Sequence, residues 1–211
     1  MFKYIATQSG ALLPDDDALR DTAEALEIAR QFGDDFSLTN AEFTRGLILV
    51  RHENADRNLG FELLDRARRV ALQHRNLIVA AWCVDIDLAA EKNRIGDYDG
   101  AIDLCSAALD NEIRCGEMTN RGWCTSVLVE ALLNRGRDTD LDEAQNAVDN
   151  LAAMANEPGY VYNELPLLRL NAMLAKARGD EDRYRDFREQ YRARAESCGF
   201  EGHTAMAHAM V

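Results

Sequence analysis

Three carboxylates fall within seven residues of the sequence, Asp85, Asp87 and Glu91. Asp87 and Glu91 are four positions apart, a spacing that puts both side chains on one face of a helix. Paired carboxylates can hold a cation through their oxygens, or act as a general acid and a general base. On a chain with a formal charge of −13, such carboxylates are mostly solvated or matched with Arg. We therefore expect a polar contact on an inner surface here, rather than catalysis.

The spacing of the histidines and the absence of the known catalytic motifs also argue against catalysis. His52, His74, His203 and His208 form no pair at i, i+4 spacing, and no Cys or Asp stands beside them at the spacing of a metal ligand. The sequence also lacks GxxxxGK[ST], GxGxxG, HExxH and GxSxG. We predict no catalytic residue, no cofactor and no metal site, and therefore no enzymatic activity.

Aromatic residues mark a second group of candidates. Trp82, Trp123, Tyr160 and Tyr162 fall at corresponding places in successive helical hairpins, in the first half of the second helices or just before them. We interpret aromatic residues at these places first as core residues. The alternative interpretation is that they line a groove for a partner. Together with Asp85 they form our candidate partner or ligand face.

Charge narrows the choice of partner. The chain has 24 Lys and Arg against 37 Asp and Glu, so its average surface repels a phosphate backbone, and we expect no direct contact with nucleic acid. Arg185, Arg188 and Arg192 form a basic stripe that could receive an acidic segment or a phosphate. Asp186 and Glu189 dilute that stripe, which favours a solvated helix face.

The sequence also bears on the compartment. No run of about 18 apolar residues could span a bilayer, and the first 14 residues lack the apolar core of a secretory signal. The cysteines are odd in number and show no CxxC pair, which is typical of reduced thiols inside a cell; they are Cys83, Cys105, Cys115, Cys124 and Cys198. We expect a cytoplasmic protein whose cysteines are small core residues, with no membrane contact.

The elements that position these residues are helices in a repeat. Apolar residues recur at helical spacing along the chain, and alternating strand-like runs are absent. Gly33, Gly116 and Gly199 are 83 residues apart, and so are Gly96 and Gly179, each of which is followed by Asp. A glycine can end a helix in the left-handed conformation, and the next Asp can cap the following helix. Half of 83 gives a period of about 41 to 42 residues.

The fold class that follows is all-α, a tetratricopeptide-like solenoid of about five antiparallel helical hairpins. We predict a single repeat domain over 15–211, preceded by 1–14 as an extension or the remnant of an earlier helix. First helices are expected near 15–32, 56–74, 97–115, 139–155 and 180–198, and second helices near 35–50, 77–93, 119–135, 160–178 and 201–211. The last helix is short and leaves Ala205, Met206 and Met210 to be covered, which makes a homo-oligomer an open alternative.

Several segments of the sequence resemble known protein families and suggest a functional context. GDYDGAIDL looks like the start of a tetratricopeptide repeat, although the period is longer than the usual unit of about 34 residues. The segments HENADRNLGFELLDRARRVAL, RIGDYDGAIDL, SVLVEALLNRG and the ending GFEGHTAMAHAM resemble the C-terminal helical region of large bacterial proteins that join a class III adenylate or guanylate cyclase domain to a STAND-type ATPase. Some relatives carry a LuxR-type DNA-binding domain instead.

The resemblance runs from about residue 18 to the C-terminus and implies a function by context. It implies a regulatory or scaffold module that contacts a protein partner, or the ATPase and cyclase domains of a parent protein, in signal transduction. The cyclase residues, the Walker motif and the helix-turn-helix have no counterpart in this sequence. The alternative is a sensor with a pocket on its concave face for a small-molecule inducer or a peptide.

Overall fold

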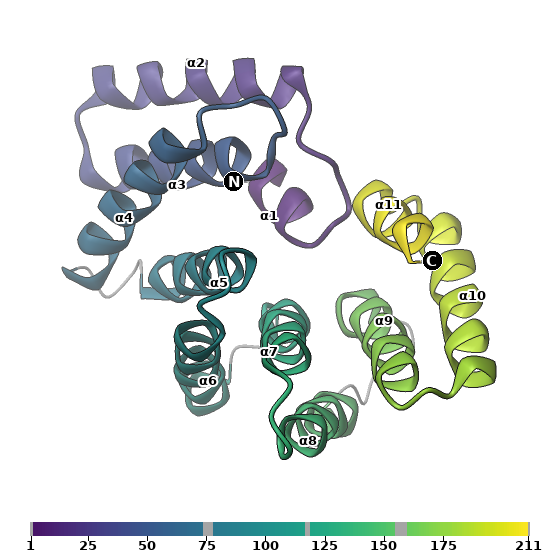
Figure 1. Ribbon diagram of the computed structural model, residues 1–211. Helices are drawn as coiled ribbons and strands as arrows, with labels where there is room; N and C mark the ends of the chain where they lie inside the picture. Colours follow the sequence, from purple (N-terminus) through teal and green to yellow (C-terminus); the bar gives the residue numbers. More distant parts are fainter. Residues whose placement is uncertain (1, 74–77, 117–118, 155–159, 211) are drawn as a thin grey trace. The chain divides into compact units, whose positions relative to one another are not determined.

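The computed structural model describes residues 2–73, 78–116, 119–154 and 160–210, and these residues contain helices and no strand (Figure 1). The helices follow one another as α1 (Phe2–Gln8), α2 (Asp16–Phe32), α3 (Asp35–Arg51), α4 (Arg57–Gln73), α5 (Ile78–Arg94), α6 (Tyr98–Cys115), α7 (Arg121–Arg135), α8 (Asp140–Met154), α9 (Val161–Ala177), α10 (Glu181–Cys198) and α11 (Glu201–Ala209). The all-α repeat fold predicted from the sequence is confirmed, and α2 to α11 are the ten helices expected. Segment 1–14, expected to be an extension or a remnant helix, contains α1.

The glycine and aspartate punctuation explains the helix ends. Gly33, Gly116 and Gly199 have φ of 72°, 70° and 67° and follow the last residues of α2, α6 and α10. On the other side of the junctions, Asp97 and Asp180 accept hydrogen bonds from the third backbone amide of α6 and α10. These contacts satisfy backbone groups that a helix leaves unpaired at its ends.

The chain divides into two compact units, Met1–Asp87 and Leu88–Val211, and the division falls inside α5. In unit 1, α3 packs against α2 and α4, and α1 packs against α3. Leu26, Leu49 and Leu63 come together from these three consecutive helices and form a buried apolar cluster. The single domain over 15–211 stays a prediction.

Two glycines allow the close packing of α3 against α4. A methyl group added at Gly46 would lie 2.9 Å from the carbonyl oxygen of Gly60, and one added at Gly60 would lie 2.7 Å from Val50 Cγ1. The absence of a side chain on both helices therefore brings their backbones together, and Leu64 fills the space next to Gly46.

Unit 2 contains α6 to α11, and each helix packs against the next along the chain. The second helices α7 and α9 also contact each other and lie side by side in Figure 1. Leu165, Tyr191, Ala195 and Ala207 form a buried cluster that joins α9, α10 and α11. No helix in the described part of the chain is both long and apolar enough to cross a membrane.

Candidate functional site

The three candidate carboxylates do not converge on one site, because each is paired with a different arginine. Arg51 Nη2 lies 3.0 Å from Asp87 Oδ1, and Arg68 Nη2 lies 3.3 Å from Asp85 Oδ2. Glu91 accepts two hydrogen bonds from Arg94 at 2.7 and 2.8 Å. Within the described residues, no group of three or more His, Cys, Asp or Glu side chains could hold a metal ion. The arrangement is that of separate ion pairs.

Asp87 is the one of the three that is buried. Burial raises the pKa of its carboxyl group to about 6, although Arg51 beside it acts in the opposite direction. Arg51 also donates a hydrogen bond of 2.9 Å to the carbonyl oxygen of Thr7 at the end of α1. The Arg51 guanidinium therefore links α1, α3 and α5, which is a structural role.

The aromatic candidates stand where the repeat predicted them but do not form one face. Trp82 is buried near the start of α5 together with its neighbour Cys83, and it belongs to unit 1 as does Asp85. Trp123, Tyr160 and Tyr162 belong to unit 2 and are half-buried near the starts of α7 and α9. Of the five candidate residues, Tyr160 and Tyr162 are in direct ring contact, with centroids 5.8 Å apart.

Tyr160 and Tyr162 belong to a chain of five rings, which we call the ring cluster. The Tyr162 ring lies 6.4 Å from Phe200, Phe200 lies 6.1 Å from His203, and His203 meets Tyr191 edge to face at 5.6 Å. The members are Tyr160, Tyr162, Tyr191, Phe200 and His203. Phe200, Tyr191 and His203 were not predicted from the sequence, because they lie on other helices at no common spacing. The ring cluster fastens α9 and α10 to the short helix α11.

An ion pair lies next to the ring cluster. Arg169 Nη1 on α9 is 2.6 Å from Glu130 Oε1 on α7. Burial disfavours the charge on Arg169, but Glu130 outweighs this and raises the arginine pKa. Burial also raises the pKa of Tyr191, which is close enough to both side chains to feel their charges. Tyr191 is therefore neutral at pH 7 and serves as a hydrogen-bonding group.

Asn163 is a buried polar side chain at the contact of α7 and α9. It is 1% exposed, and neither its amide nitrogen nor its amide oxygen has a hydrogen-bond partner among the described residues. Pro166, inside α9, has no N–H to donate to the carbonyl oxygen of Tyr162. Gly122 of α7 packs against that oxygen, so closely that a methyl group there would be 2.4 Å away.

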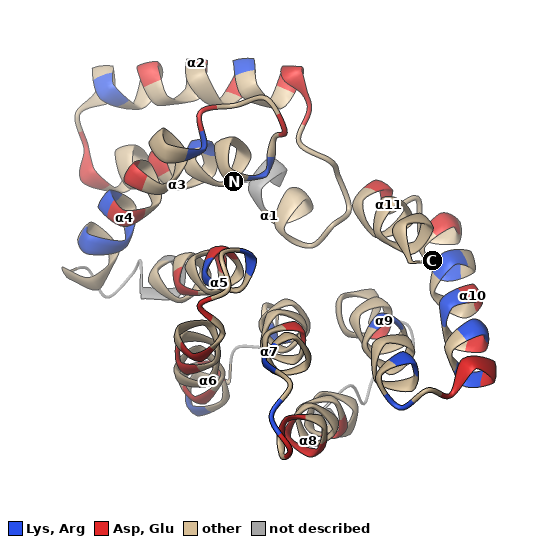
Figure 2. Ribbon diagram, in the orientation of Figure 1, with Lys and Arg blue, Asp and Glu red and all other residues tan. Residues whose placement is uncertain are grey.

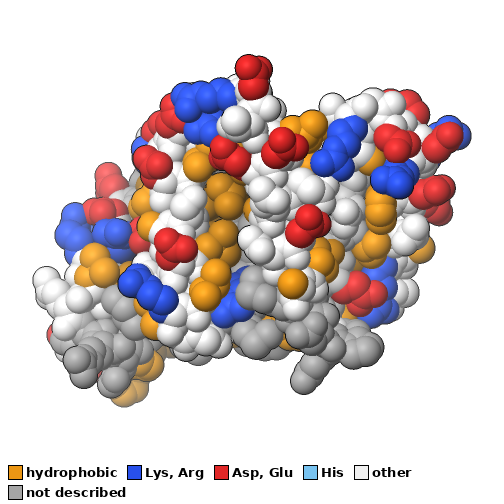
Figure 3. Space-filling view, turned by 90° about the horizontal axis from the view of Figure 1, so that it is seen from below, with side chains coloured by type: hydrophobic (Ala, Val, Ile, Leu, Met, Phe, Trp, Pro, Cys, Tyr) orange, Lys and Arg blue, Asp and Glu red, His pale blue; other side chains and the backbone are white. Residues whose placement is uncertain are grey.

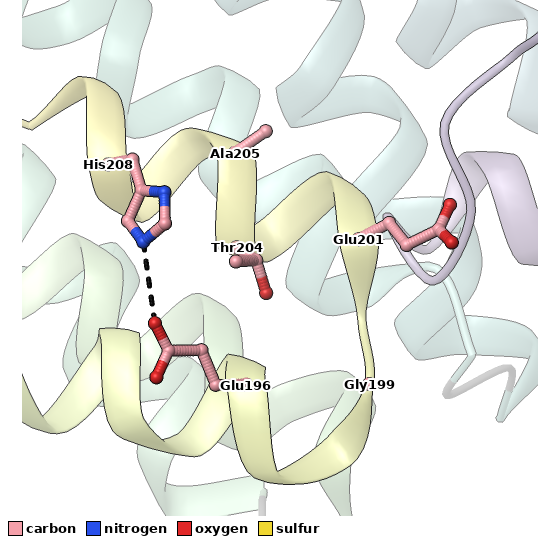
Figure 4. A pocket seen from close by; sticks show the side chains of 6 residues that line it. All are labelled: Glu196, Gly199, Glu201, Thr204, Ala205 and His208. Carbon is pink, nitrogen blue, oxygen red and sulfur yellow. Dashed lines mark hydrogen bonds and ion pairs between the residues drawn. The ribbon is translucent and has the colours of Figure 1, made fainter.

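A groove of about 590 Å³ lies between the end of α10 and α11 (Figure 4). It is lined by Glu196, Gly199, Glu201, Thr204, Ala205 and His208, and His208 Nε2 is 3.3 Å from Glu196 Oε1. Figure 4 shows the Glu201 side chain directed away from this pair. The groove is open to solvent, and its polar lining consists of the Glu196–His208 pair, Thr204 and Glu201.

The remaining sequence candidates have ordinary structural roles. In the basic stripe, Arg185 and Arg192 are exposed and paired with Asp182 and Glu189. Arg188 is half-buried, donates a hydrogen bond of 3.3 Å to the carbonyl oxygen of Met210 and lies over the Tyr184 ring, so the stripe is solvated only in part. Met210 packs against the buried clusters of unit 2, and Ala205 and Met206 stay exposed. His52 and His208 are each within 3.3 Å of a carboxylate, His203 is buried, and His74 lies outside the described residues.

The cysteines require one correction. Cys83, Cys105 and Cys124 are buried as predicted, Cys198 is half-buried, and all five cysteines are free thiols. Cys115, expected in the core, is exposed: it continues the spacing of the buried stripe formed by Ala101, Cys105, Ala108 and Glu112, but it is the last residue of α6, where the covered part of the helix has ended.

Three apolar residues that the sequence analysis did not single out are exposed at the turn between α2 and α3. Phe32 is 77% exposed, Phe36 54% and Ile28 46%. We call them the tip surface. On the face drawn in Figure 3, by contrast, hydrophobic side chains form narrow strips between ridges that carry charges. Clustered exposed apolar side chains rimmed by charges are typical of protein contacts.

The segment that carries the tip surface is acidic, and Glu24, Glu27, Asp34 and Asp35 are the acidic residues nearest to it in the sequence. Residues 15–36 contain eight Asp and Glu and two Arg, which gives this segment a net charge of −6. Both arginines are already paired, Arg20 with Asp17 and Arg30 with Glu27. Figure 2 marks acidic residues at intervals along α2 and at the turn into α3. The hydrogen bond from the backbone amide of Ser37 lowers the pKa of Asp34, so this carboxylate stays ionised.

Comparisons of the chain with protein-family models, curated proteins and solved structures give no match. The link to the cyclase and STAND ATPase proteins therefore stays a prediction from sequence resemblance.

Proposed function

We propose that this chain is a non-catalytic module that binds another protein through the tip surface. The observation that carries the proposal is the exposure of Ile28, Phe32 and Phe36 on both sides of one helix turn. Large apolar and aromatic side chains are the usual anchors of protein interfaces, because their burial removes much apolar area from water. The candidate carboxylates support a non-catalytic role, since each is paired with an arginine.

The sequence resemblance suggests the context of this binding. We propose a regulatory or scaffold arm of a cyclase-linked or transcription-linked ATPase, located in the cytoplasm, whose partner is the ATPase or cyclase domain. The free thiols are compatible with a reducing compartment. The acidic composition supports a protein partner over nucleic acid.

The test is direct binding by calorimetry to the recombinant STAND ATPase and cyclase domains of such a protein. The variant Phe32→Ser with Phe36→Ser should weaken binding at least about tenfold. Ile95→Ser with Ile113→Ser is the matched control, because it also removes two exposed apolar side chains, and it should bind as the wild type does. Absence of binding by the wild type, or equal loss in both variants, would count against the proposal.

A sensor for a small molecule or a peptide is the second candidate, and the observation that favours it is Asn163. A buried amide with unused donors and acceptors costs free energy unless something pairs with it. A ligand bound to the native state raises its melting temperature. Thermal-shift screening with metabolites should therefore find a compound whose effect disappears in Asn163→Leu but persists in Asn171→Leu. A screen without any such compound would speak against this candidate.

A further inference from the structure

We infer that the segment that docks on the tip surface is an amphipathic helix whose apolar ridge is flanked by Lys and Arg. The inference rests on the proposed function and specifies the chemistry of the partner. Three observations lead to it: the comparison with later hairpins, the helical spacing of the exposed residues, and the charge.

The later hairpins show that the fold does not need apolar residues at these places. The residues 83 positions after Ile28, Phe32 and Phe36 are Asn111, Cys115 and Thr119. A further 83 positions along, the residues are Arg194, Cys198 and Gly202. The corresponding turns therefore form with small or polar side chains. The tip surface is a property of the first hairpin alone among these three copies.

The spacing of the exposed side chains favours a helix as the occupant. Ile28 and Phe32 are one turn apart on α2, so they form a ridge along one side of the helix. Such a ridge packs into the groove between side chains of a second helix. Phe36 stands across the turn at the start of α3 and extends the apolar area beyond the end of α2.

Charge decides the flanking residues and excludes a second copy of the chain. The segment 15–36 has a net charge of −6, and Asp34 stays ionised next to Phe32 and Phe36. Two copies brought together through the tip surface would place like charges opposite each other, which is unfavourable. A partner with Lys and Arg beside its apolar ridge gains attraction at the same positions and associates faster.

The test uses two labelled 18-residue peptides with the same Leu ridge, one with Lys and Arg at its other positions and one with Glu. Binding to the full chain is measured by fluorescence anisotropy at low and high salt. The basic peptide should bind at least about tenfold more tightly than the acidic one, and high salt should weaken its binding. Glu24→Gln with Glu27→Gln should lower its affinity, while Ile113→Ser should not.

The outcomes separate the two proposals. Loss of basic-peptide binding in Phe32→Ser with Phe36→Ser supports the inference. If the acidic peptide binds as tightly and still depends on these two phenylalanines, the inference about charge is wrong and binding through the tip surface stands. If neither peptide depends on them, the helix inference is overturned, and only the calorimetry with ATPase and cyclase domains bears on the proposed function. Both substituted residues are exposed, so the variants should fold.

Discussion

The hydroxyl oxygen of Tyr191 lies 2.6 Å from Nδ1 of His203, and this contact joins α10 to α11. Both residues are buried, and Tyr191 contacts the apolar cluster that includes Ala207 of α11. Helix α11 has only nine residues, too few to be stable as an isolated helix. Its position therefore depends on the ring cluster and on this hydrogen bond.

Replacing Tyr191 by Phe tests that dependence. The variant keeps the ring but removes the hydroxyl, so His203 loses a partner in a buried place. The free energy of unfolding should fall by about 1 to 2 kcal/mol, measured by urea denaturation followed by circular dichroism. Tyr98→Phe on α6 is the matched control and should change stability by less than about 0.5 kcal/mol. Equal effects of the two substitutions would show that the Tyr191 hydroxyl contributes no more to the free energy of unfolding than the Tyr98 hydroxyl does.

A second prediction concerns pH and Asp87. Its folded-state pKa of about 6 lies above the ordinary value of 3.8 for an aspartate. Between these two values the folded state binds more protons than the unfolded state, so the contribution of Asp87 to stability decreases as pH rises. Above pH 6 the ionised, buried carboxylate costs on the order of 3 kcal/mol relative to the neutral form. Asp87→Asn keeps the side-chain shape without the ionisation.

The measurement compares wild type and Asp87→Asn by urea denaturation at pH 4, 5, 6 and 7. The stability of the variant relative to the wild type should increase from pH 4 to pH 6 and then level off. Asp110→Asn, on the exposed side of α6, controls for the loss of one acidic residue from an acidic chain. A difference between Asp87→Asn and wild type that does not change with pH would contradict the raised pKa.

The sequence predicted the helices well because their end signals are local. Gly33, Gly116 and Gly199 end helices through their own backbone conformation, and Asp97 caps α6 three residues away. The repeat of 83 residues puts these helix-end signals at equivalent positions in successive hairpins, so they can be recognised without knowledge of any tertiary contact. Elements and their order could therefore be read from residues close together in the chain.

The partners across the fold could not be predicted in this way. Asp87 meets Arg51, which is 36 residues away, and Tyr191 meets His203 on another helix. No periodic pattern connects the residues of either pair. The sequence does contain a signal for the tip surface. At steps of 83 residues from Phe32, the equivalent positions are occupied by the smaller residues Cys115 and Cys198. That comparison was informative only once exposure showed that Phe32 is not a core residue.

A third prediction concerns Arg135, which connects three consecutive helices. It lies 2.6 Å from Asp99 of α6 and also 2.6 Å from Asp140 of α8, whose side chain is buried. Arg135→Met leaves the Asp140 carboxylate without its guanidinium and should lower the free energy of unfolding by about 3 kcal/mol at pH 7. Arg137→Met, which removes an exposed pair with Asp99, should cost at most about 1 kcal/mol.

The pH dependence of the Arg135 effect has a defined sign. The hydrogen bond from Arg135 lowers the pKa of Asp140 in the folded state. Its stabilising contribution is therefore present above the unfolded pKa of an aspartate and is lost as pH falls through the folded value. The difference in melting temperature between wild type and Arg135→Met should shrink at low pH. A difference that grew on acidification would mean that Asp140 is not the group involved.

The last prediction is Gly122→Ala, where two physical effects oppose each other. Within a helix this change usually stabilises by up to about 1 kcal/mol, because glycine loses more backbone entropy on folding. At Gly122, however, the new methyl group would lie 2.4 Å from the carbonyl oxygen of Tyr162 and 3.0 Å from Pro166 Cγ. An oxygen of the backbone cannot move aside as a flexible side chain can, so α7 and α9 must separate.

Separation of two packed helices costs about 1 to 3 kcal/mol, so Gly122→Ala should destabilise the protein on balance. Ser106→Ala, on the exposed side of α6, is the control for helix propensity alone and should be neutral or slightly stabilising. Adding Pro166→Ala removes one of the two clashing groups and gives the Tyr162 carbonyl an N–H partner, so the double variant should recover part of the loss. Urea denaturation of the four proteins decides the question, because a Gly122→Ala variant as stable as the wild type would mean that α7 and α9 do not need this close approach.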